Sequence, residues 1–150
     1  MEVLNLLKQV PDFKDVPDDQ LQWLVAKSDC LSISKGEPLF APGNPIDKML
    51  IIIDGSFVIK MPRNNQYQIL GRFEKHTITG LLPYSRATEA KAIAEAVEDA
   101  KVISLNEKYF KEMIHDCHEL TTVLVHAMST RIRQFTKREQ QDDKMLALGK

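Results

Sequence analysis

The chain has few cysteines and no long apolar segment. Of its 150 residues only Cys30 and Cys117 are cysteines, too few for a disulfide framework or a four-cysteine metal site. The longest apolar run, Met49–Ile53, is far shorter than the roughly 20 residues that cross a bilayer. Residues 1–30 lack the basic start and continuous apolar core of a signal peptide. We therefore expect a reduced, cytoplasmic protein without a membrane span.

The chain also lacks an excess of either charge. Its net charge of −1 and pI near 6.4 give no basic face for nucleic acid. Hydrophobic residues make up 43% of the sequence and charged residues 27%, which is ordinary for a globular protein. A length of 150 residues is enough for one domain with its own core. These values predict a single globular unit with no nucleic-acid partner.

Catalytic and metal-binding motifs are missing as well. The sequence has no Gly-rich phosphate loop, no Gly-x-Ser-x-Gly elbow and no His-Glu-x-x-His. The run His115-Asp116-Cys117-His118 offers metal ligands on one helix face, but a tetrahedral site needs further ligands and none stands out. Packing or surface exposure is the favoured interpretation of this run. We expect a non-catalytic chain without a metal or cofactor.

Both ends of the chain show helical patterns. Leu4–Val10 predicts a short amphipathic helix that ends at Pro11. A second helix is expected to open at Pro17, where a missing N–H costs nothing and the two aspartates that follow favour the positive helix end. After Asn106 a long apolar stripe at spacings of three and four predicts a long C-terminal helix, with Leu120, Leu124, Met128, Ile132 and Phe135 along it.

Two roles remain open for that stripe. Its first half is expected to pack back on the chain's own domain. The second half outruns a small domain, which favours pairing with a second copy in a parallel homodimer through a seam of Leu124, Met128, Ile132 and Phe135.

The middle of the chain has the patterns of strands and turns. Leu31 and Ile33 alternate with serines, and turns are predicted around Gly36 and Gly43. Asp54-Gly55, between two β-rich runs, predicts a hairpin. Two further strands are expected at Tyr67–Leu70 and Lys101–Leu105.

Residues 87–100 give conflicting signals. The segment is rich in alanine, glutamate and lysine, so propensity alone predicts a helix. Alanines nevertheless occupy the alternate positions 90, 92, 94 and 96, which is the period of a strand. We expect a short helix near Leu81–Tyr84, then a loop, then a strand from about Ala92.

One segment carries chemistry, the run Gly80-Leu81-Leu82-Pro83-Tyr84-Ser85-Arg86-Ala87-Thr88. It resembles the phosphate-binding cassette of the cyclic nucleotide-binding domain family, of the catabolite-activator-like sensor type. The resemblance covers roughly Leu6–Phe135 and implies an α+β fold: an eight-stranded jelly-roll-like β-barrel (a double-stranded β-helix), short N-terminal helices and a long C-terminal helix. It also implies that the ligand-binding residues are Gly80, Leu81, Leu82, Ser85, Arg86, Ala87 and Thr88.

In that family a helix N-terminus and an arginine hold the cyclic phosphate, and a glutamate accepts from the ribose. Arg86 matches the arginine, but Leu81 stands where the glutamate is expected and cannot accept a hydrogen bond. His76 stands where the family usually has glycine, and the run from Arg86 to Leu105 is longer than usual. Losing the acceptor costs about 1–3 kcal/mol, roughly ten- to a hundredfold in affinity. A cyclic nucleotide or similar small anionic ligand is therefore expected to bind weakly, if Arg86 still faces the pocket.

The last nine residues, 142–150, resemble the opening of the dimerisation helix of bacterial sensor histidine kinases. This resemblance implies a sensor domain at residues 1–135, with residues 136–150 starting the connection to a kinase in a two-component system. Alternatives are a ligand-free dimerisation module and the ligand domain of a catabolite-activator-type transcription regulator. The latter would need a helix-turn-helix, which these residues lack. A cupin enzyme is disfavoured because its His-x-His and glutamate spacing is missing.

Overall fold

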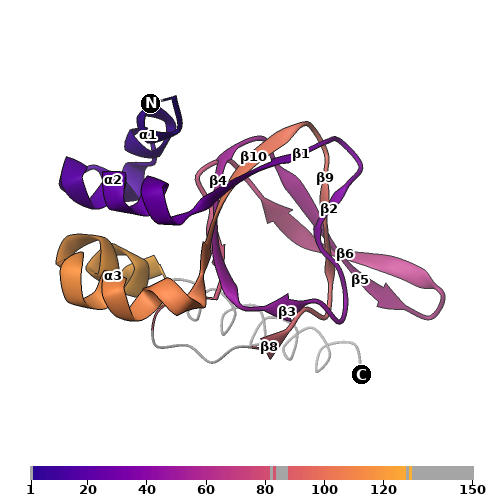
Figure 1. Cartoon of the computed structure of the whole chain (residues 1–150). Helices are drawn as coiled ribbons and strands as arrows, with labels where there is room; N and C mark the ends of the chain where they lie inside the picture. The colour runs from indigo at the N-terminus through magenta and orange to yellow at the C-terminus, as the bar shows by residue number, and fades with distance from the viewer. Residues whose placement is uncertain (1, 82, 84–87, 128, 130–150) are drawn as a thin grey trace, which may run out of the picture.

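A computed structural model describes residues 2–81, 83, 88–127 and 129 (Figure 1). The chain begins with α1 (Glu2–Lys8) and α2 (Asp18–Lys27), the two short helices that the sequence predicts, joined by a 3₁₀ turn (Pro11–Phe13) that it does not. The described strands are β1 (Asp29–Ile33), β2 (Pro38–Phe40), β3 (Pro45–Ile46), β4 (Lys48–Asp54), β5 (Phe57–Arg63), β6 (Gln66–Phe73), β7 (Ile78–Gly80), β8 (Thr88–Glu89), β9 (Ile93–Ala96) and β10 (Ala100–Asn106). A second 3₁₀ turn (Glu107–Tyr109) leads into α3 (Phe110–Asp116).

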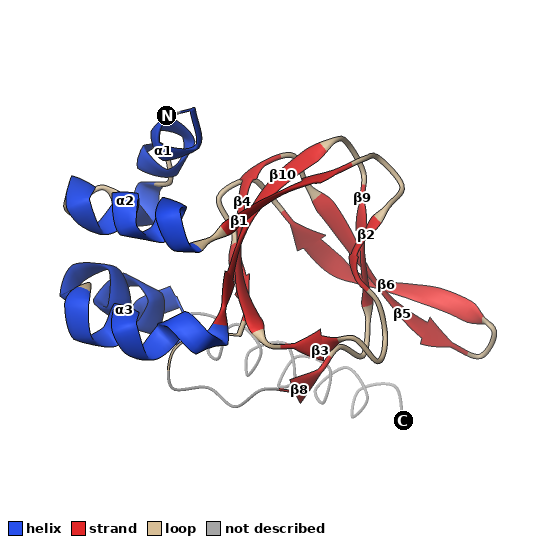
Figure 2. Cartoon of the chain, viewed as in Figure 1, coloured by secondary structure: helices blue, strands red, loops and turns tan. Residues whose placement is uncertain are grey.

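The strands form two facing antiparallel sheets rather than a closed barrel. The first sheet has the order β1-β10-β4-β7 and the second β2-β9-β5-β6, while β3 and β8 form a separate pair (Figure 2). The expected jelly-roll-like arrangement is confirmed, but the expected closed barrel is wrong. Within the described residues, no strand of one four-stranded sheet pairs with a strand of the other, so the interior is enclosed by side chains packed between two layers.

The predicted Asp54-Gly55 hairpin is also wrong, because β4 and β5 belong to different sheets. Gly55 has φ +84, and a Cβ added there would lie 2.7 Å from the Cα of Ala100. Glycine is therefore needed where the chain crosses between layers. The hairpin lies one strand later, between β5 and β6, where Asn64 and Asn65 have φ of 51° and 65°. Asparagine tolerates this left-handed conformation, which tight hairpin turns require.

Strand β4 has two buried faces. Met49, Ile51 and Ile53 pack with the helices on one side, and Leu50 and Ile52 face the second sheet on the other. A strand buried on both faces reads as a continuous apolar run, as this one does. Figure 2 shows the helices gathered against the outer side of the first sheet. The helix–sheet core and the core between the sheets thus share β4.

The strand prediction for the alanine-rich segment is confirmed. Ala94 and Ala96 are 0% and 2% exposed, and β9 pairs with both β2 and β5. Pairing on both sides outweighs helix propensity at these positions. The short helix expected at Leu81–Tyr84 falls partly outside the described residues. Leu81 lies in a bend and Pro83 in a turn.

The expected single long C-terminal helix is corrected in the described part of the chain. Helix α3 ends at Asp116, Cys117 leaves helical geometry with φ −121° and ψ 74°, and residues 118–127 are helical again. Leu120 and Leu124 are fully buried in the chain's own core. Leu124 therefore does not belong to a free dimer seam. Met128, Ile132, Phe135 and residues 136–150 lie outside the described residues.

Gln20 joins α2 to the helical residues after the break. Its side-chain oxygen accepts from the backbone N–H of Leu120 at 2.9 Å, and its side-chain nitrogen donates to Glu119. Because the first N–H groups of a helix have no partner within it, Gln20 acts as an N-cap supplied by another helix. The hydrogen bond from Gln20 also lowers the pKa of Glu119. No helix among the described residues is long and apolar enough to cross a membrane.

Candidate functional site

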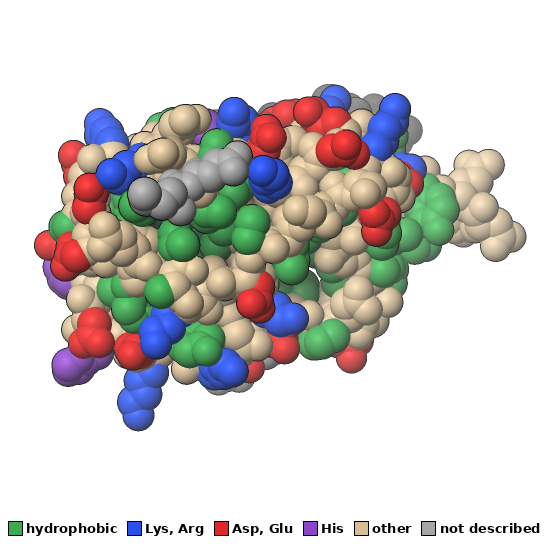
Figure 3. Space-filling model, turned by 45° about the horizontal axis from the view of Figure 1, so that its top comes forward, with side chains coloured by type: hydrophobic (Ala, Val, Ile, Leu, Met, Phe, Trp, Pro, Cys, Tyr) green, Lys and Arg blue, Asp and Glu red, His purple; other side chains and the backbone are tan. Residues whose placement is uncertain are grey.

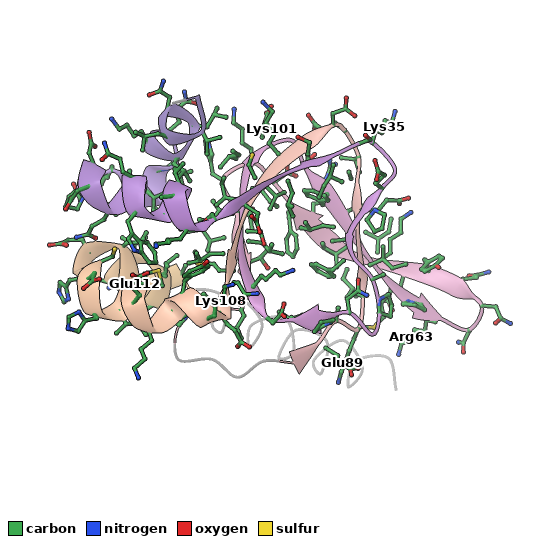
Figure 4. All side chains as sticks on the ribbon, in the orientation of Figure 1. Lys35, Arg63, Glu89, Lys101, Lys108 and Glu112 are labelled. Carbon is green, nitrogen blue, oxygen red and sulfur yellow. The ribbon has the colours of Figure 1, made fainter. Side chains whose placement is uncertain are left out.

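A cavity of about 310 Å³ lies between the two sheets. The first sheet supplies one wall and β2 with the β2–β3 connection the other. The lining residues are Asp29, Leu31, Leu39, Phe40, Asn44, Pro45, Ile46, Asp47, Lys48, Leu50, Gly80 and Ser104. The cavity lies toward the β3–β8 end of the sandwich, where Figure 4 labels Glu89, and Lys35 and Lys101 mark the opposite end.

Among the predicted cassette residues that the structure describes, Gly80 lines this cavity. It ends β7 with φ +80, and an added Cβ would lie 2.4 Å from the carbonyl oxygen of Lys48. The next backbone N–H, of Leu81, donates to that same oxygen at 2.9 Å. Glycine is thus required for β7 to leave the sheet beside β4. The cassette glycine therefore has a geometric basis in this chain.

Leu81 stands at the position of the missing glutamate and is 3% exposed. It is not one of the described residues that line the cavity. Thr88 lies in β8, where its backbone pairs with Ile46 of the lining. The remaining predicted site residues, Leu82, Ser85, Arg86 and Ala87, lie outside the described residues, so their ligand roles stay predictions.

His76 occupies a backbone conformation suited to glycine. Its φ is +76°, in the left-handed region that residues other than glycine adopt uncommonly, although Asn, Asp and His do so more often than the rest. Its N–H donates to Ile52 at 2.6 Å, and its ring Nε2 is buried with no partner among the described residues. The expectation that His76 replaces a family glycine is thus supported by the backbone geometry here.

One transverse row of residues crosses the inner face of the first sheet. Asp29 pairs with Ser104, Ser104 with Leu50, and Leu50 with Thr79. Directly paired residues of antiparallel strands point to the same side, so all four share the face that holds the cavity. Sequence analysis missed Asp29 and Ser104. The available signal was their spacing: Asp29 lies two residues before Leu31 and Ser104 two residues after Val102, and alternate residues of a strand face the same side.

The rim of the cavity is charged. Asp29 and Lys48 are exposed residues that line it and Asp47 is half-buried, while Leu39 and Phe40 form its apolar wall. The ring of Phe40 lies 6.4 Å from that of Phe73, centroid to centroid, which fixes it against the second sheet. An apolar wall with a few polar groups at one edge suits a small, partly polar ligand.

The His115–His118 run does not gather ligands in the structure. Within the described residues, no group of three or more His, Cys, Asp or Glu side chains lies close enough to hold a metal ion. His115 contacts Asp116 at 2.6 Å on the surface, which raises the pKa of His115. Cys117 is instead 2% exposed, and burial, with the charge of Asp116 adding to it, raises the pKa of its thiol to about 11.

Comparison with solved structures identifies the fold. A cyclic nucleotide-binding domain from Methylobacillus flagellatus has a TM-score of 0.75 at 16% identity, covering 94% of this chain and 82% of that one. The N-terminal domain of a transcriptional regulator from Streptomyces coelicolor has a TM-score of 0.69 at 20% identity, covering 88% and 95%.

Comparison of sequences gives relatives that are much longer. An uncharacterized NTE family protein of Mycobacterium tuberculosis is 23% identical over 128 residues, covering 85% of this chain and 21% of that protein. The chain therefore spans about a fifth of the length of the curated relatives it matches. Residues 30–117, more than half of the sequence, match the family model of the cyclic nucleotide-binding domain, and the chain belongs to that family.

Proposed function

We propose that this chain is a non-catalytic sensor domain that binds a cyclic nucleotide or similar small anionic ligand weakly. The observation that carries the proposal is the cavity that reaches Gly80, the glycine of the cassette. The buried Leu81 beside it offers no acceptor for a ribose hydroxyl. An unpaired hydroxyl costs about 1–3 kcal/mol, so binding is roughly ten- to a hundredfold weaker than with a glutamate there.

Arg86 is proposed to supply the charge-assisted contact to the phosphate. This role follows from its place after the cassette in the sequence. Arg86→Ala then abolishes binding, while Arg63→Ala, on the exposed end of β5, leaves it unchanged.

Calorimetric titration with cyclic AMP and cyclic GMP tests the proposal. We expect dissociation constants of about 10 μM or weaker for the chain as it stands. Leu81→Glu is expected to strengthen binding, with Leu81→Met as the apolar control. Submicromolar affinity in the unaltered chain contradicts the account of Leu81, and no heat of binding in any variant contradicts ligand sensing.

We propose that the ligand-binding signal passes through the residues after α3 to a histidine kinase. Gln20 ties the helical residues 118–127 to α2, and Leu120 and Leu124 pack in the core behind β4. Leu50 on the other face of β4 lines the cavity. A ligand that binds one arrangement of these elements better than another would shift the position of the chain's exit. The proposed parent protein is then a sensor kinase, in which residues 1–135 form the sensor domain and residues 136–150 begin the connection to the kinase.

A ligand-free dimerisation module is the second candidate, and the burial of Leu81 is the observation that favours it. In both cases we propose a homodimer through the apolar positions Met128, Ile132 and Phe135. Binding of nucleotide separates the two candidates, because the module without a ligand shows none.

A further inference from the structure

The cavity has a polar end that the cassette does not explain. Ser104 lines it and is 4% exposed. Asp29, its direct cross-strand partner, lines the same cavity from the exposed rim. Polar groups that line a mostly apolar cavity fix the orientation of its ligand, so this pair restricts what can bind beside it.

This polar pair lies far from the cassette glycine. Asp29 is on β1 and Gly80 on β7, at opposite edges of the four-stranded sheet. Three strand spacings separate the edges by about 14 Å. Leu31 and Phe40 line the space with apolar surface. The cavity therefore accommodates an elongated, flat ligand with its anionic group near Gly80 and its hydrogen-bonding edge near Asp29 and Ser104.

The chemistry of the pair restricts that edge. An ionised carboxylate only accepts hydrogen bonds and offers two oxygens, whereas a hydroxyl can both donate and accept. Guanine presents two adjacent donors, the ring N1–H and the exocyclic amino group, beside the acceptor O6. Adenine presents a single donor group beside an acceptor nitrogen. Guanine can donate two hydrogen bonds to the carboxylate and accept one from the hydroxyl, so it satisfies the pair more fully than adenine does.

We propose that Asp29 and Ser104 recognise the guanine edge of a cyclic purine nucleotide, a specificity that rests on the proposed ligand-sensing function. Asp29 accepts from N1–H and the amino group, and Ser104 donates to O6. The apolar side chains of Leu31 and Phe40 hold the faces of the base. The choice between guanine and adenine then rests on residues of two neighbouring strands, β1 and β10.

Titration of the unaltered chain with cyclic GMP, cyclic IMP and cyclic AMP tests this. Cyclic IMP differs from cyclic GMP only by the missing amino group. We expect cyclic GMP to bind about tenfold more tightly than cyclic IMP, the size of one charge-assisted hydrogen bond. Asp29→Asn should remove that preference, and Ser104→Ala should weaken cyclic GMP several-fold. Asp12→Asn, the same change of charge at an exposed position on the helical side, should preserve the preference.

The outcomes separate the two proposals. Binding of all three nucleotides with equal affinity, or a guanine preference that survives Asp29→Asn, overturns the assignment of Asp29 and leaves ligand sensing intact. No binding of any of the three at millimolar concentration overturns both. Circular dichroism of each variant confirms that the fold is retained.

Discussion

The carbonyl oxygen of Lys48 occupies the space that a side chain at Gly80 would need. A Cβ built on Gly80 lies 2.4 Å from that oxygen, and the N–H of Leu81 donates to the same oxygen at 2.9 Å. The first residue of β4 and the last residue of β7 are thus held together where the cassette begins. This contact places the cassette against the cavity, and a substitution tests it directly.

Gly80→Ala is expected to lower the free energy of unfolding by about 3 kcal/mol. A positive φ costs an alanine about 1–2 kcal/mol, and the contact with a backbone oxygen adds to it. Gly36→Ala is the matched control, since Gly36 has φ +90 and nothing within 4 Å of an added Cβ. Urea denaturation measures both variants. If both variants lost the same free energy of unfolding, the contact between the added Cβ and the carbonyl oxygen of Lys48 would carry no cost.

His76→Gly is expected to raise the free energy of unfolding by about 1 kcal/mol. The change relieves the left-handed backbone at φ +76° and removes the buried Nε2 that has no described partner. Asn64→Gly, at φ 51° on an exposed hairpin turn, should gain less because asparagine tolerates that conformation. A destabilised His76→Gly variant would mean that the imidazole makes a favourable contact.

The two cysteines should differ sharply in reactivity. Cys30 is exposed, whereas Cys117 is buried with a thiol pKa raised to about 11. Alkylation of the folded chain at pH 8 should therefore modify Cys30 alone, because the thiolate is the reacting species. Above about pH 9 the unfolded chain loses the Cys117 proton before the folded chain does, so stability should fall toward pH 11. Mass spectrometry reads the sites, and rapid labelling of Cys117 would contradict its burial.

The dimer proposal predicts a response to charge at the C-terminal positions. Ile132→Glu combined with Phe135→Glu should convert a concentration-dependent dimer into a folded monomer. Several buried apolar side chains contribute several kcal/mol at about 25 cal/mol per Å², before the cost of association. Sedimentation equilibrium measures the mass. The double variant Tyr67→Glu with Ile69→Glu, on the exposed apolar surface of β6, is the control and should leave the dimer intact. The reverse pattern would move the interface to that hairpin, which projects from the body in Figure 3.

Several strands could be predicted from local patterns. The alternation at Leu31 and Ile33 and the apolar run at Met49–Ile53 gave β1 and β4. Alternate alanines gave β9 against their helix propensity. These predictions succeeded because a period of two reflects burial on one face, which pairing enforces. The turn at Asp54-Gly55 was misassigned because a glycine that permits a close approach looks the same in sequence as a glycine in a hairpin.

The site was less accessible to sequence reasoning. Gly80 could be found because its surroundings resemble a family motif. Asp29 and Ser104 are 75 positions apart in the sequence and meet only through the β1–β10 register. No local pattern brings together residues whose proximity depends on strand pairing. The break at Cys117 was missed for a similar reason, since the apolar stripe continues across it at helical spacing.

The most direct test of the central claim is a nuclear magnetic resonance titration of the ¹⁵N-labelled chain with cyclic GMP. We expect saturable shifts at the amides of Leu31, Leu50, Gly80 and Ser104, which line the cavity, and none at Asn64 and Tyr67 on the hairpin. The fitted dissociation constant should be about 10 μM or weaker. Shifts confined to the hairpin, or none at about 10 mM nucleotide, would contradict a ligand cavity between the two sheets.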